Sequence, residues 1–171
     1  NQATVPLYAE VVREFVKQYG QPDAVVGHSM GTFASFYSFY KHPDITPRAL
    51  VALAPPGEAS EFVYYFKRQL SLSDRLTNIL VDYFRKLFQA PPEFFSAPKF
   101  ASGLDIPGLL IHDEHDNETS VQHSRRIHAA WKSSQLSTTN GLGHNLKSPE
   151  IVDQVFNFVN KNLNQFSVAS R

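Results

Sequence analysis

The stretch Ala24-Val25-Val26-Gly27-His28-Ser29-Met30-Gly31 decides the fold, because a short apolar run ends there in Gly-x-Ser-x-Gly. The run predicts a strand, and residues 32–40 directly after it predict a helix. A serine on so sharp a turn holds its hydroxyl above the sheet, and the flanking glycines leave the neighbouring backbone unobstructed. Ser29 is therefore a candidate nucleophile, and the N–H of Met30 is a candidate oxyanion donor. The alternative is an ordinary serine in a glycine-bounded turn, which the flanking strand and helix disfavour.

The composition is that of an ordinary globular domain. The 171 residues suffice for one domain with a sizeable core, and 42% of them are hydrophobic and 19% charged. A formal net charge of +0 gives no reason to expect nucleic acid or an anionic membrane surface as a partner. We expect no membrane span and no signal peptide. The absence of cysteine excludes disulfides, thiolate metal sites and a cysteine nucleophile, and it is compatible with a cytoplasmic location.

Strands alternate with helices along the chain, which predicts the α/β class with a parallel sheet of about four strands. Helical periodicity runs from Val5 to Tyr19 and stops at Gly20. The later strands are expected at residues 48–54, 106–112 and 135–139. The later helices are expected at residues 119–131 and from Ser148 onward. Residues 1–171 are thus predicted to form a single domain.

A long insert at residues 58–104 separates the second and third expected strands. Its most regular helix has Ser73 as the expected N-cap and ends at Ala90-Pro91-Pro92. The apolar stripe of that helix consists of Leu76, Ile79, Leu80, Tyr83, Phe84, Leu87 and Phe88. The insert is too short to hold its own core, so we expect a helical cap over Ser29 rather than a separate domain. Its aromatic side chains predict either plain core packing or an apolar substrate pocket.

A serine nucleophile needs a general base, and the base needs an acid that orients it. His144 is the candidate base, because it ends a glycine-flanked loop after the last strand and can reach back over the sheet. Asp116 is the candidate acid, because it lies a few residues past the end of the third strand. Asp113, at that strand end, is the alternative acid. The order serine, aspartate, histidine along the chain is the one expected for a nucleophile on such a turn.

Imidazole and carboxylate side chains gather after the third strand, at His112, Asp113, His115 and Asp116. A group of this kind also suits a divalent metal ion. An acid loop beside the serine turn explains the same residues with fewer assumptions, so we expect neither a metal nor a cofactor.

The three motifs in combination resemble those of the α/β-hydrolase superfamily, in its esterase, lipase and thioesterase branch. Gly27-His28-Ser29-Met30-Gly31 resembles the nucleophile elbow, and residues 141–144 resemble the histidine loop. Residues 111–116 resemble the strand end His-Gly-x-x-Asp, with Asp113 in place of the glycine. The resemblance implies a serine hydrolase that cleaves a small carboxylic ester or thioester through an acyl-enzyme. It implies a catalytic triad of Ser29, Asp116 and His144, with Met30 as an oxyanion donor.

The family's sheet normally has about eight strands, and a loop after an earlier strand supplies the second oxyanion donor. This chain starts one helix before the serine strand, so those N-terminal strands are absent from it. Two alternatives to a complete enzyme follow: a truncated hydrolase with an incomplete oxyanion hole, or a non-catalytic interaction module. In the family's strand order, residues 24–27 would become a sheet edge. Such an edge predicts self-association or pairing with an N-terminal partner segment.

Overall fold

The computed structural model describes residues 4–168, and the side chains of residues 4–164. Its strands form one parallel sheet in the order β1-β2-β3-β4. They are β1 (Ala24–His28), β2 (Ala49–Leu53), β3 (Gly108–Asp113) and β4 (Ser134–Thr139). The predicted α/β class and four-stranded parallel sheet are thereby confirmed. β3 begins two residues later than predicted, because Pro107 has no N–H to donate to a ladder.

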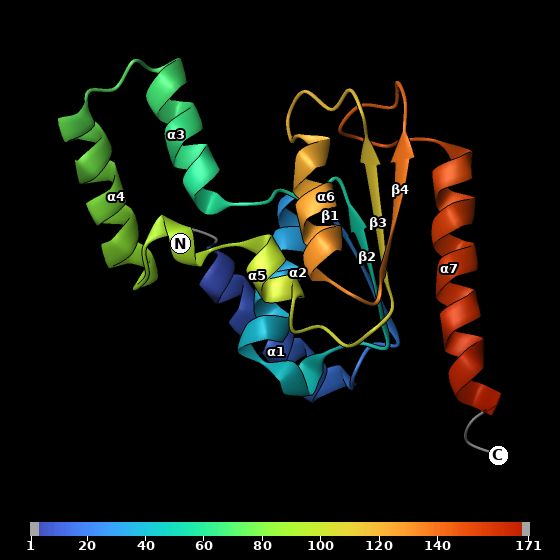
Figure 1. Cartoon of the computed structure of the whole chain (residues 1–171). Helices are drawn as coiled ribbons and strands as arrows, with labels where there is room; N and C mark the ends of the chain where they lie inside the picture. Colours follow the sequence, from blue (N-terminus) through green and yellow to red (C-terminus); the bar gives the residue numbers. More distant parts are fainter. Residues whose placement is uncertain (1–3, 169–171) are drawn as a thin grey trace.

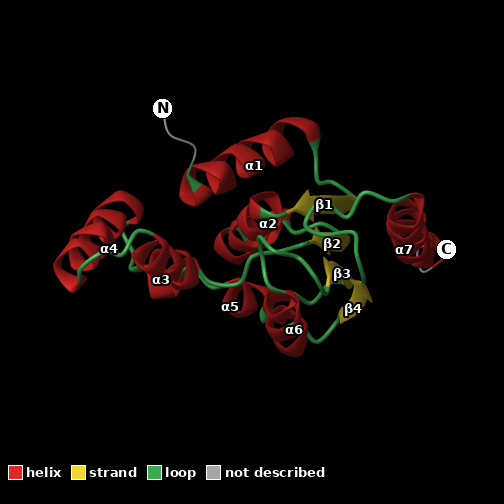
Figure 2. Cartoon of the chain, turned by 90° about the horizontal axis from the view of Figure 1, so that it is seen from above, coloured by secondary structure: helices red, strands yellow, loops and turns green. Residues whose placement is uncertain are grey.

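Helices cover both faces of this sheet (Figures 1 and 2). One side carries α1 (Val5–Tyr19), α2 (Met30–Lys41), α5 (Ala97–Ala101) and α6 (Val121–Ala130). The other face carries α7 (Pro149–Val168). Two short 3₁₀ turns, η1 (Pro43–Ile45) and η2 (Pro92–Phe94), complete the elements outside the hairpin described below. No helix within residues 4–168 is both long and apolar enough to cross a membrane.

The main core lies between the sheet and the helices α2, α5 and α6. Phe36, Leu110 and Trp131 are completely buried there, and the rings of Phe36 and Trp131 meet edge to face at 5.6 Å. A Cβ atom on Gly108 would lie 2.2 Å from the Trp131 ring, so only glycine fits beneath that indole. A second core joins the opposite face of the sheet to α7 through Val51, Ile111 and their neighbours. Both faces of the central strands are therefore dry, as parallel sheets require.

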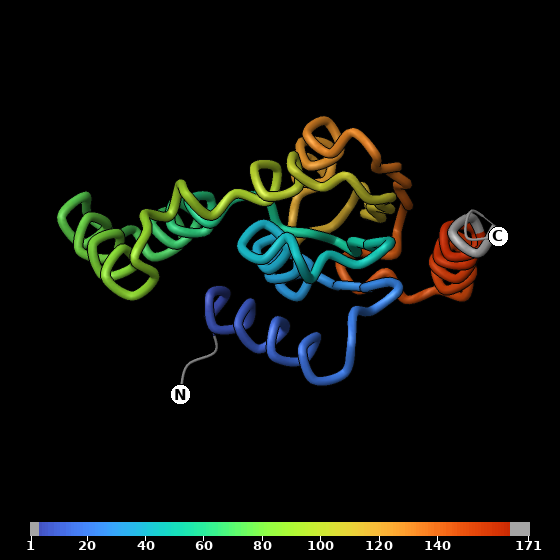
Figure 3. The backbone as a smooth tube through the Cα atoms, turned by 90° about the horizontal axis from the view of Figure 1, so that it is seen from below, coloured from blue at the N-terminus to red at the C-terminus, as the bar shows by residue number. Residues whose placement is uncertain are grey.

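A helical hairpin of α3 (Ala59–Gln69) and α4 (Asp74–Phe88) projects to one side of the sheet (Figures 1 and 3). Ser73 caps α4 as predicted, since its Oγ accepts the N–H of Leu76 at 3.3 Å. The base of the hairpin is closed where Glu58 and Ser96 pair in a single antiparallel bridge. The apolar stripe of α4 is only partly covered. The ring of Phe84 meets that of Phe95 edge to face at 5.6 Å, whereas other members of the stripe, Leu76, Ile79 and Tyr83, are more than half exposed.

β1 pairs only with β2 in the described chain, so the predicted sheet edge is confirmed. The apolar side chains around this edge are exposed. Val26 of β1 is 52% exposed. The outer surface of α1 exposes Leu7, Tyr8, Val11, Phe15 and Tyr19, and α7 exposes Val152 and Phe156. The edge therefore presents unpaired backbone groups flanked by apolar surface.

Candidate active site

Ser29 occupies the tight turn between β1 and α2. Its backbone has φ 51°, in the left-handed region, and its N–H donates to Leu53 O at 2.9 Å. Such a conformation costs about 1–3 kcal/mol in a non-glycine residue and persists only where its surroundings hold it. A Cβ atom on Gly27 would lie 2.8 Å from Thr32 Cα, so glycine is required for the close approach of α2. The expectation that Gly31 is also needed to leave the neighbouring backbone unobstructed is wrong, because a Cβ atom there would meet nothing within 4 Å among the described residues.

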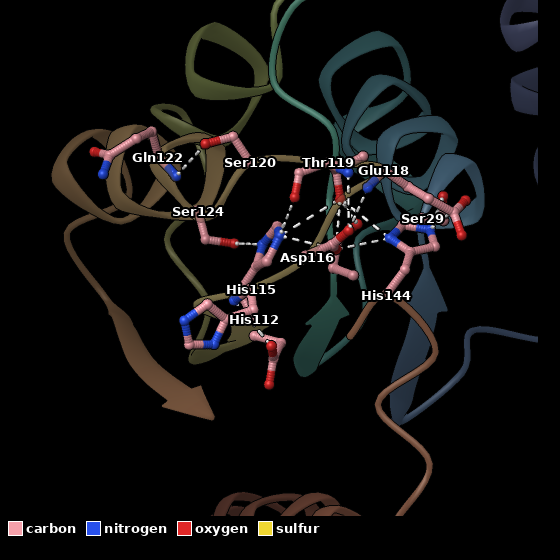
Figure 4. Close-up of polar contacts among 12 residues, drawn as sticks. Ser29, His112, His115, Asp116, Glu118, Thr119, Ser120, Gln122, Ser124 and His144 are labelled. Atoms are coloured by element: carbon pink, nitrogen blue, oxygen red, sulfur yellow. Dashed lines mark hydrogen bonds and ion pairs between the residues drawn. The ribbon is translucent and has the colours of Figure 1, made fainter. Parts of the chain in front are cut away.

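Ser29, His144 and Asp116 come from three separate segments and meet at one end of the sheet (Figure 4). His144 Nε2 lies 3.0 Å from Ser29 Oγ, and His144 Nδ1 lies 2.7 Å from Asp116 Oδ2. Because a carboxylate only accepts, Nδ1 carries a hydrogen and Nε2 is free to accept the serine hydroxyl. An imidazole in this tautomer can take up a hydroxyl proton. The structure thus brings together the three residues selected from the sequence.

The carboxylate of Asp116 is completely buried and accepts several hydrogen bonds. Oδ1 accepts the N–H groups of Glu118 at 2.8 Å and Thr119 at 3.0 Å. Oδ2 accepts the hydroxyl of Thr119 at 3.0 Å, in addition to the ring of His144. Burial alone would raise the pKa of Asp116, but these hydrogen bonds outweigh it and lower the pKa below its ordinary value. Asp116 is therefore an ionised, fixed partner for the imidazole.

Asp113, the alternative acid, holds the backbone of the histidine loop. Its Oδ2 accepts the N–H of Leu142 and the hydroxyl of Thr139, both at 2.8 Å. Its Oδ1 accepts the N–H of His115 at 2.9 Å. Burial opposes ionisation of this carboxyl, yet the hydrogen bonds lower its pKa to about 2. The two carboxylates therefore make different contacts with one loop, Asp116 with the ring of His144 and Asp113 with the backbone before it.

Comparisons with known proteins agree with this architecture. No family model matches the sequence. A segment of 49 residues is 37% identical to a proline iminopeptidase of Xanthomonas citri, a match that spans 29% of this chain and 16% of that protein. Among solved structures, an α/β-hydrolase enzyme from a sediment metagenome of the Mar Chica lagoon, Morocco, superposes with a TM-score of 0.67 at 19% identity. That match covers 96% of this chain and 73% of the other. The chain has the α/β-hydrolase fold.

Two further structures with this fold extend the comparison. The meta-cleavage product hydrolase CumD of Pseudomonas fluorescens IP01 gives a TM-score of 0.64 at 13% identity, over 96% of this chain and 73% of that one. The esterase domain of a Rhodothermus marinus protein gives 0.59 at 15% identity, over 85% and 61%. At these identities the likeness establishes the α/β-hydrolase fold alone, and the chain spans 61% to 73% of the three structures.

Three residues that the sequence analysis did not assign to the candidate triad contact this site of the α/β-hydrolase fold, and His112 among them was considered only as a metal ligand. His28, between Gly27 and Ser29, donates from Nε2 to the carbonyl of His144 at 2.9 Å. The Thr119 hydroxyl lies 3.0 Å from Asp116 Oδ2, and His112 Nε2 lies 3.2 Å from the same oxygen. His28 lies inside the Gly-x-Ser-x-Gly motif, so its position next to Ser29 could have indicated that it belongs to the site. The contacts of Thr119 and His112 arise only when the acid loop folds back on β3.

No group of three or more histidine, cysteine or acidic side chains in the described residues is arranged to hold a metal ion. His112, Asp113 and Asp116, three members of the candidate metal group, are buried and hydrogen-bonded within the protein. Their lone pairs therefore serve protein donors, and the acid-loop interpretation accounts for them.

An apolar pocket of about 300 Å³ lies between the helical hairpin and α2. Its walls include Met30 and Phe33 of α2, Phe62 and Phe66 of α3, and Phe84 and Phe88 of α4. Met30 directly follows Ser29 and is half exposed, so the pocket begins one residue from the serine. A lining of this kind suits the apolar part of a small ligand.

Proposed function

We propose that this protein is a serine hydrolase that cleaves a small carboxylic ester or thioester through an acyl-enzyme. The observation that carries the proposal is the hydrogen-bonded chain from Ser29 through His144 to Asp116, with distances of 3.0 and 2.7 Å. A serine hydroxyl is a weak nucleophile by itself and becomes reactive beside an oriented base. The structures that are similar to this chain include a meta-cleavage product hydrolase and an esterase domain, which favours the same reaction class.

In the first half of the reaction, Ser29 Oγ attacks the carbonyl carbon while His144 Nε2 takes the hydroxyl proton. The ionised carboxylate of Asp116 stabilises the imidazolium that forms. The N–H of Met30, at the first position of α2, has no acceptor within its own helix and is available to the developing oxyanion. His144 then returns the proton to the leaving alcohol or thiol, and an acyl-enzyme remains on Ser29.

In the second half, His144 removes a proton from a water molecule that attacks the acyl carbon. The resulting tetrahedral intermediate collapses, Ser29 Oγ leaves with the proton held by His144, and the carboxylic acid is released. Of the oxyanion donors that these steps use, the described residues supply the N–H of Met30.

The helical hairpin α3–α4 is the cap in this proposal, and the pocket beside Met30 receives the apolar part of the substrate. The pocket walls offer aromatic rings from both hairpin helices, such as Phe62 and Phe84. Each methylene group buried there would contribute about 0.8 kcal/mol. The proposal therefore favours an ester or thioester with an apolar acyl or alcohol group.

Steady-state hydrolysis by the parent and by Ser29→Ala tests the proposal. The substrates are p-nitrophenyl acetate, p-nitrophenyl butyrate and an acyl thioester, and far-ultraviolet circular dichroism reports on folding. We expect Ser29→Ala to lower kcat by about 10³-fold or more, because the covalent route is lost. Ser102→Ala is the matched control, since the Ser102 hydroxyl donates only to Lys99 O on the surface. Equal turnover by a folded Ser29→Ala variant would remove Ser29 from the mechanism.

A non-catalytic interaction module is the second candidate function, and the exposed edge of β1 favours it. Val26 on that edge and Val11 and Phe15 on α1 are all more than half exposed. An apolar strand with unpaired backbone groups is a template for binding another chain. A fluorophosphonate probe separates the two candidates. Covalent labelling of Ser29 supports the hydrolase, and a folded chain that stays unlabelled supports the module.

A further inference from the structure

The carboxylate of Asp116 lies between two serine–histidine pairs (Figure 4). Ser29 and His144 form the outer pair. On the inner side, His112 Nε2 lies 3.2 Å from Asp116 Oδ2, and His112 Nδ1 lies 2.7 Å from Ser124 Oγ. His112 and Ser124 are completely buried. The inner pair therefore contacts the proposed triad acid from the side opposite to His144, where no substrate can reach.

The neighbours of His112 determine where its hydrogen lies. Nε2 faces two acceptors, the carbonyl of Thr119 at 2.9 Å and the carboxylate of Asp116, so Nε2 carries a hydrogen. Burial lowers the pKa of His112 and keeps the ring neutral, although the carbonyl of Thr119 and the charge of Asp116 oppose this shift. Nδ1 is then an acceptor, and the Ser124 hydroxyl donates to it. The acceptors at Nε2 thereby set the tautomer that points a donor at Asp116, and Ser124 supplies the matching donor at Nδ1.

We propose that His112, held by Ser124, is a positioning residue for the triad acid. Its Nε2–H fixes Oδ2 of Asp116 at the place where that oxygen receives the Nδ1–H of His144. This inference rests on the proposed serine-hydrolase function. Without His112, the buried carboxylate of Asp116 loses its 3.2 Å contact with Nε2 and gains freedom to rotate away from His144.

A positioning role makes two predictions that a packing role does not. The inner pair lies away from the substrate, so its loss lowers kcat and leaves KM unchanged. Each hydrogen bond to Asp116 also disperses the charge of the carboxylate. With one donor removed, Asp116 attracts the protonated imidazole of His144 more strongly, and the acid limb of the pH–rate profile moves to higher pH.

The pH profile has few other contributors near the inner pair. The titratable groups that act on His112 are Asp116 of the acid loop, His144 of the histidine loop and His123 of α6. His123 is itself paired with Glu61 of α3 at 2.9 Å, and its pKa is lowered chiefly by burial. Variants of Ser124 and His112 leave the His123–Glu61 pair in place. The groups that face His144 besides Asp116, namely Glu118 with Oε2 at 3.8 Å from Nε2 and His28, are also unchanged in these variants. A shifted limb therefore reports on Asp116 and His144.

Three variants test the inference in the full chain with p-nitrophenyl butyrate. Ser124→Ala removes the donor to Nδ1, and His112→Asn removes the donor to Asp116. His112→Gln places an amide N–H near the position of Nε2 and is the conservative rescue. We expect the first two to lower kcat by about 10- to 100-fold, with an unchanged KM and the acid limb shifted to higher pH. His112→Gln should recover most of kcat.

Ser134→Ala is the matched control, because Ser134 is a buried serine that lies 2.8 Å from Nδ1 of His128, away from the site. It should leave kcat and the pH profile unchanged. If His112→Asn does not fold, Ser124→Ala, which removes a single oxygen, decides the question. Parental kcat and an unshifted pH profile in Ser124→Ala and in a folded His112→Asn would overturn the positioning role alone. An inactive, folded parent would instead overturn the proposed function, and the positioning role with it.

Discussion

Leu142 N–H donates a hydrogen bond of 2.8 Å to Asp113 Oδ2, which ties the loop that carries His144 to the end of β3. The same oxygen accepts the hydroxyl of Thr139 on the neighbouring strand β4. Three residues further along, Asp116 contacts the ring of His144. One short stretch of chain therefore supplies two acids, one for the backbone of the histidine loop and one for its imidazole.

These different contacts predict which of two substitutions, Asp116→Asn or Asp113→Asn, lowers kcat more. Asp116→Asn should lower kcat by about 10⁴-fold, because an amide can hold the imidazole in the wrong tautomer. Asp113→Asn should lower kcat much less and should cost about 1–3 kcal/mol of unfolding free energy, since buried donors lose a charged acceptor. Steady-state kinetics and urea denaturation of both variants measure the two effects. The reverse order in kcat would transfer the acid role to Asp113.

The stability of the fold should depend on pH through two histidines whose pKa is lowered in the folded chain. Burial is the largest cause of the lowered pKa values of His112 and His123, whose ordinary value is 6.5. Below about pH 6.5 the unfolded chain therefore binds more protons than the folded chain, and the free energy of unfolding falls as pH decreases. Asp113, with its pKa of about 2 against an ordinary 3.8, adds a further loss as pH falls from about 4 through about 2.

Urea denaturation at pH 8 and pH 5 measures the histidine contribution. We expect a lower midpoint at pH 5, and a smaller difference in His112→Gln, which removes one of the two imidazoles whose pKa is lowered. Equal midpoints at the two pH values in the parent would contradict this account of His112 and His123.

The pocket beside Met30 predicts a dependence on acyl-chain length. If each added methylene is buried, kcat/KM should rise about fourfold per methylene, which corresponds to about 0.8 kcal/mol, until the pocket is full. Phe84→Ala removes a pocket wall and should flatten this dependence. Tyr83→Ala is the control, because Tyr83 is 58% exposed on the same helix. A series of p-nitrophenyl esters gives the slope of log kcat/KM against acyl-chain length for each variant. Equal slopes in Phe84→Ala and Tyr83→Ala would show that the pocket does not bind the acyl chain.

The open edge of β1 predicts association. We expect the chain by itself to self-associate at micromolar concentration, or to bind an N-terminal partner segment, because edge pairing satisfies backbone groups and covers Val26. Val26→Lys places a charge on the edge and should reduce the mass measured by light scattering. Leu70→Lys, at the end of α3, changes an apolar residue that is 64% exposed and far from the edge, and it should not reduce that mass. A cooperative monomer without a partner would contradict the expectation.

Local patterns in the sequence predicted the strands and the principal helices, because periodicity and glycine spacing act over a few residues. These local patterns did not predict which parts of the chain pack on each helix face. The stripe of α4 is a true helix face, yet Leu76 and Tyr83 are exposed, because the described part of the chain places nothing over them. Periodicity identifies residues that share a face, whereas burial depends on tertiary neighbours.

The candidate site shows the same limit. Ser29 and His144 stand in motifs whose spacing carries chemical meaning, so they could be selected from the sequence alone. The contacts of Thr119 and His112 with Asp116 could not be predicted in this way. The two residues contact Asp116 only because the acid loop turns back over the end of β3. The hydrogen-bond partners of a motif residue are set by the folded backbone, and a motif does not list them.

Mass spectrometry after reaction with a fluorophosphonate probe tests the central claim most directly. The account predicts one covalent adduct per chain, on the peptide that contains Ser29. It predicts no adduct in Ser29→Ala and a much slower reaction in His144→Ala, because the serine then lacks its base. Circular dichroism confirms that each variant is folded. A folded parent without an adduct on Ser29, or a His144→Ala variant labelled on Ser29 at the parental rate, would contradict the account.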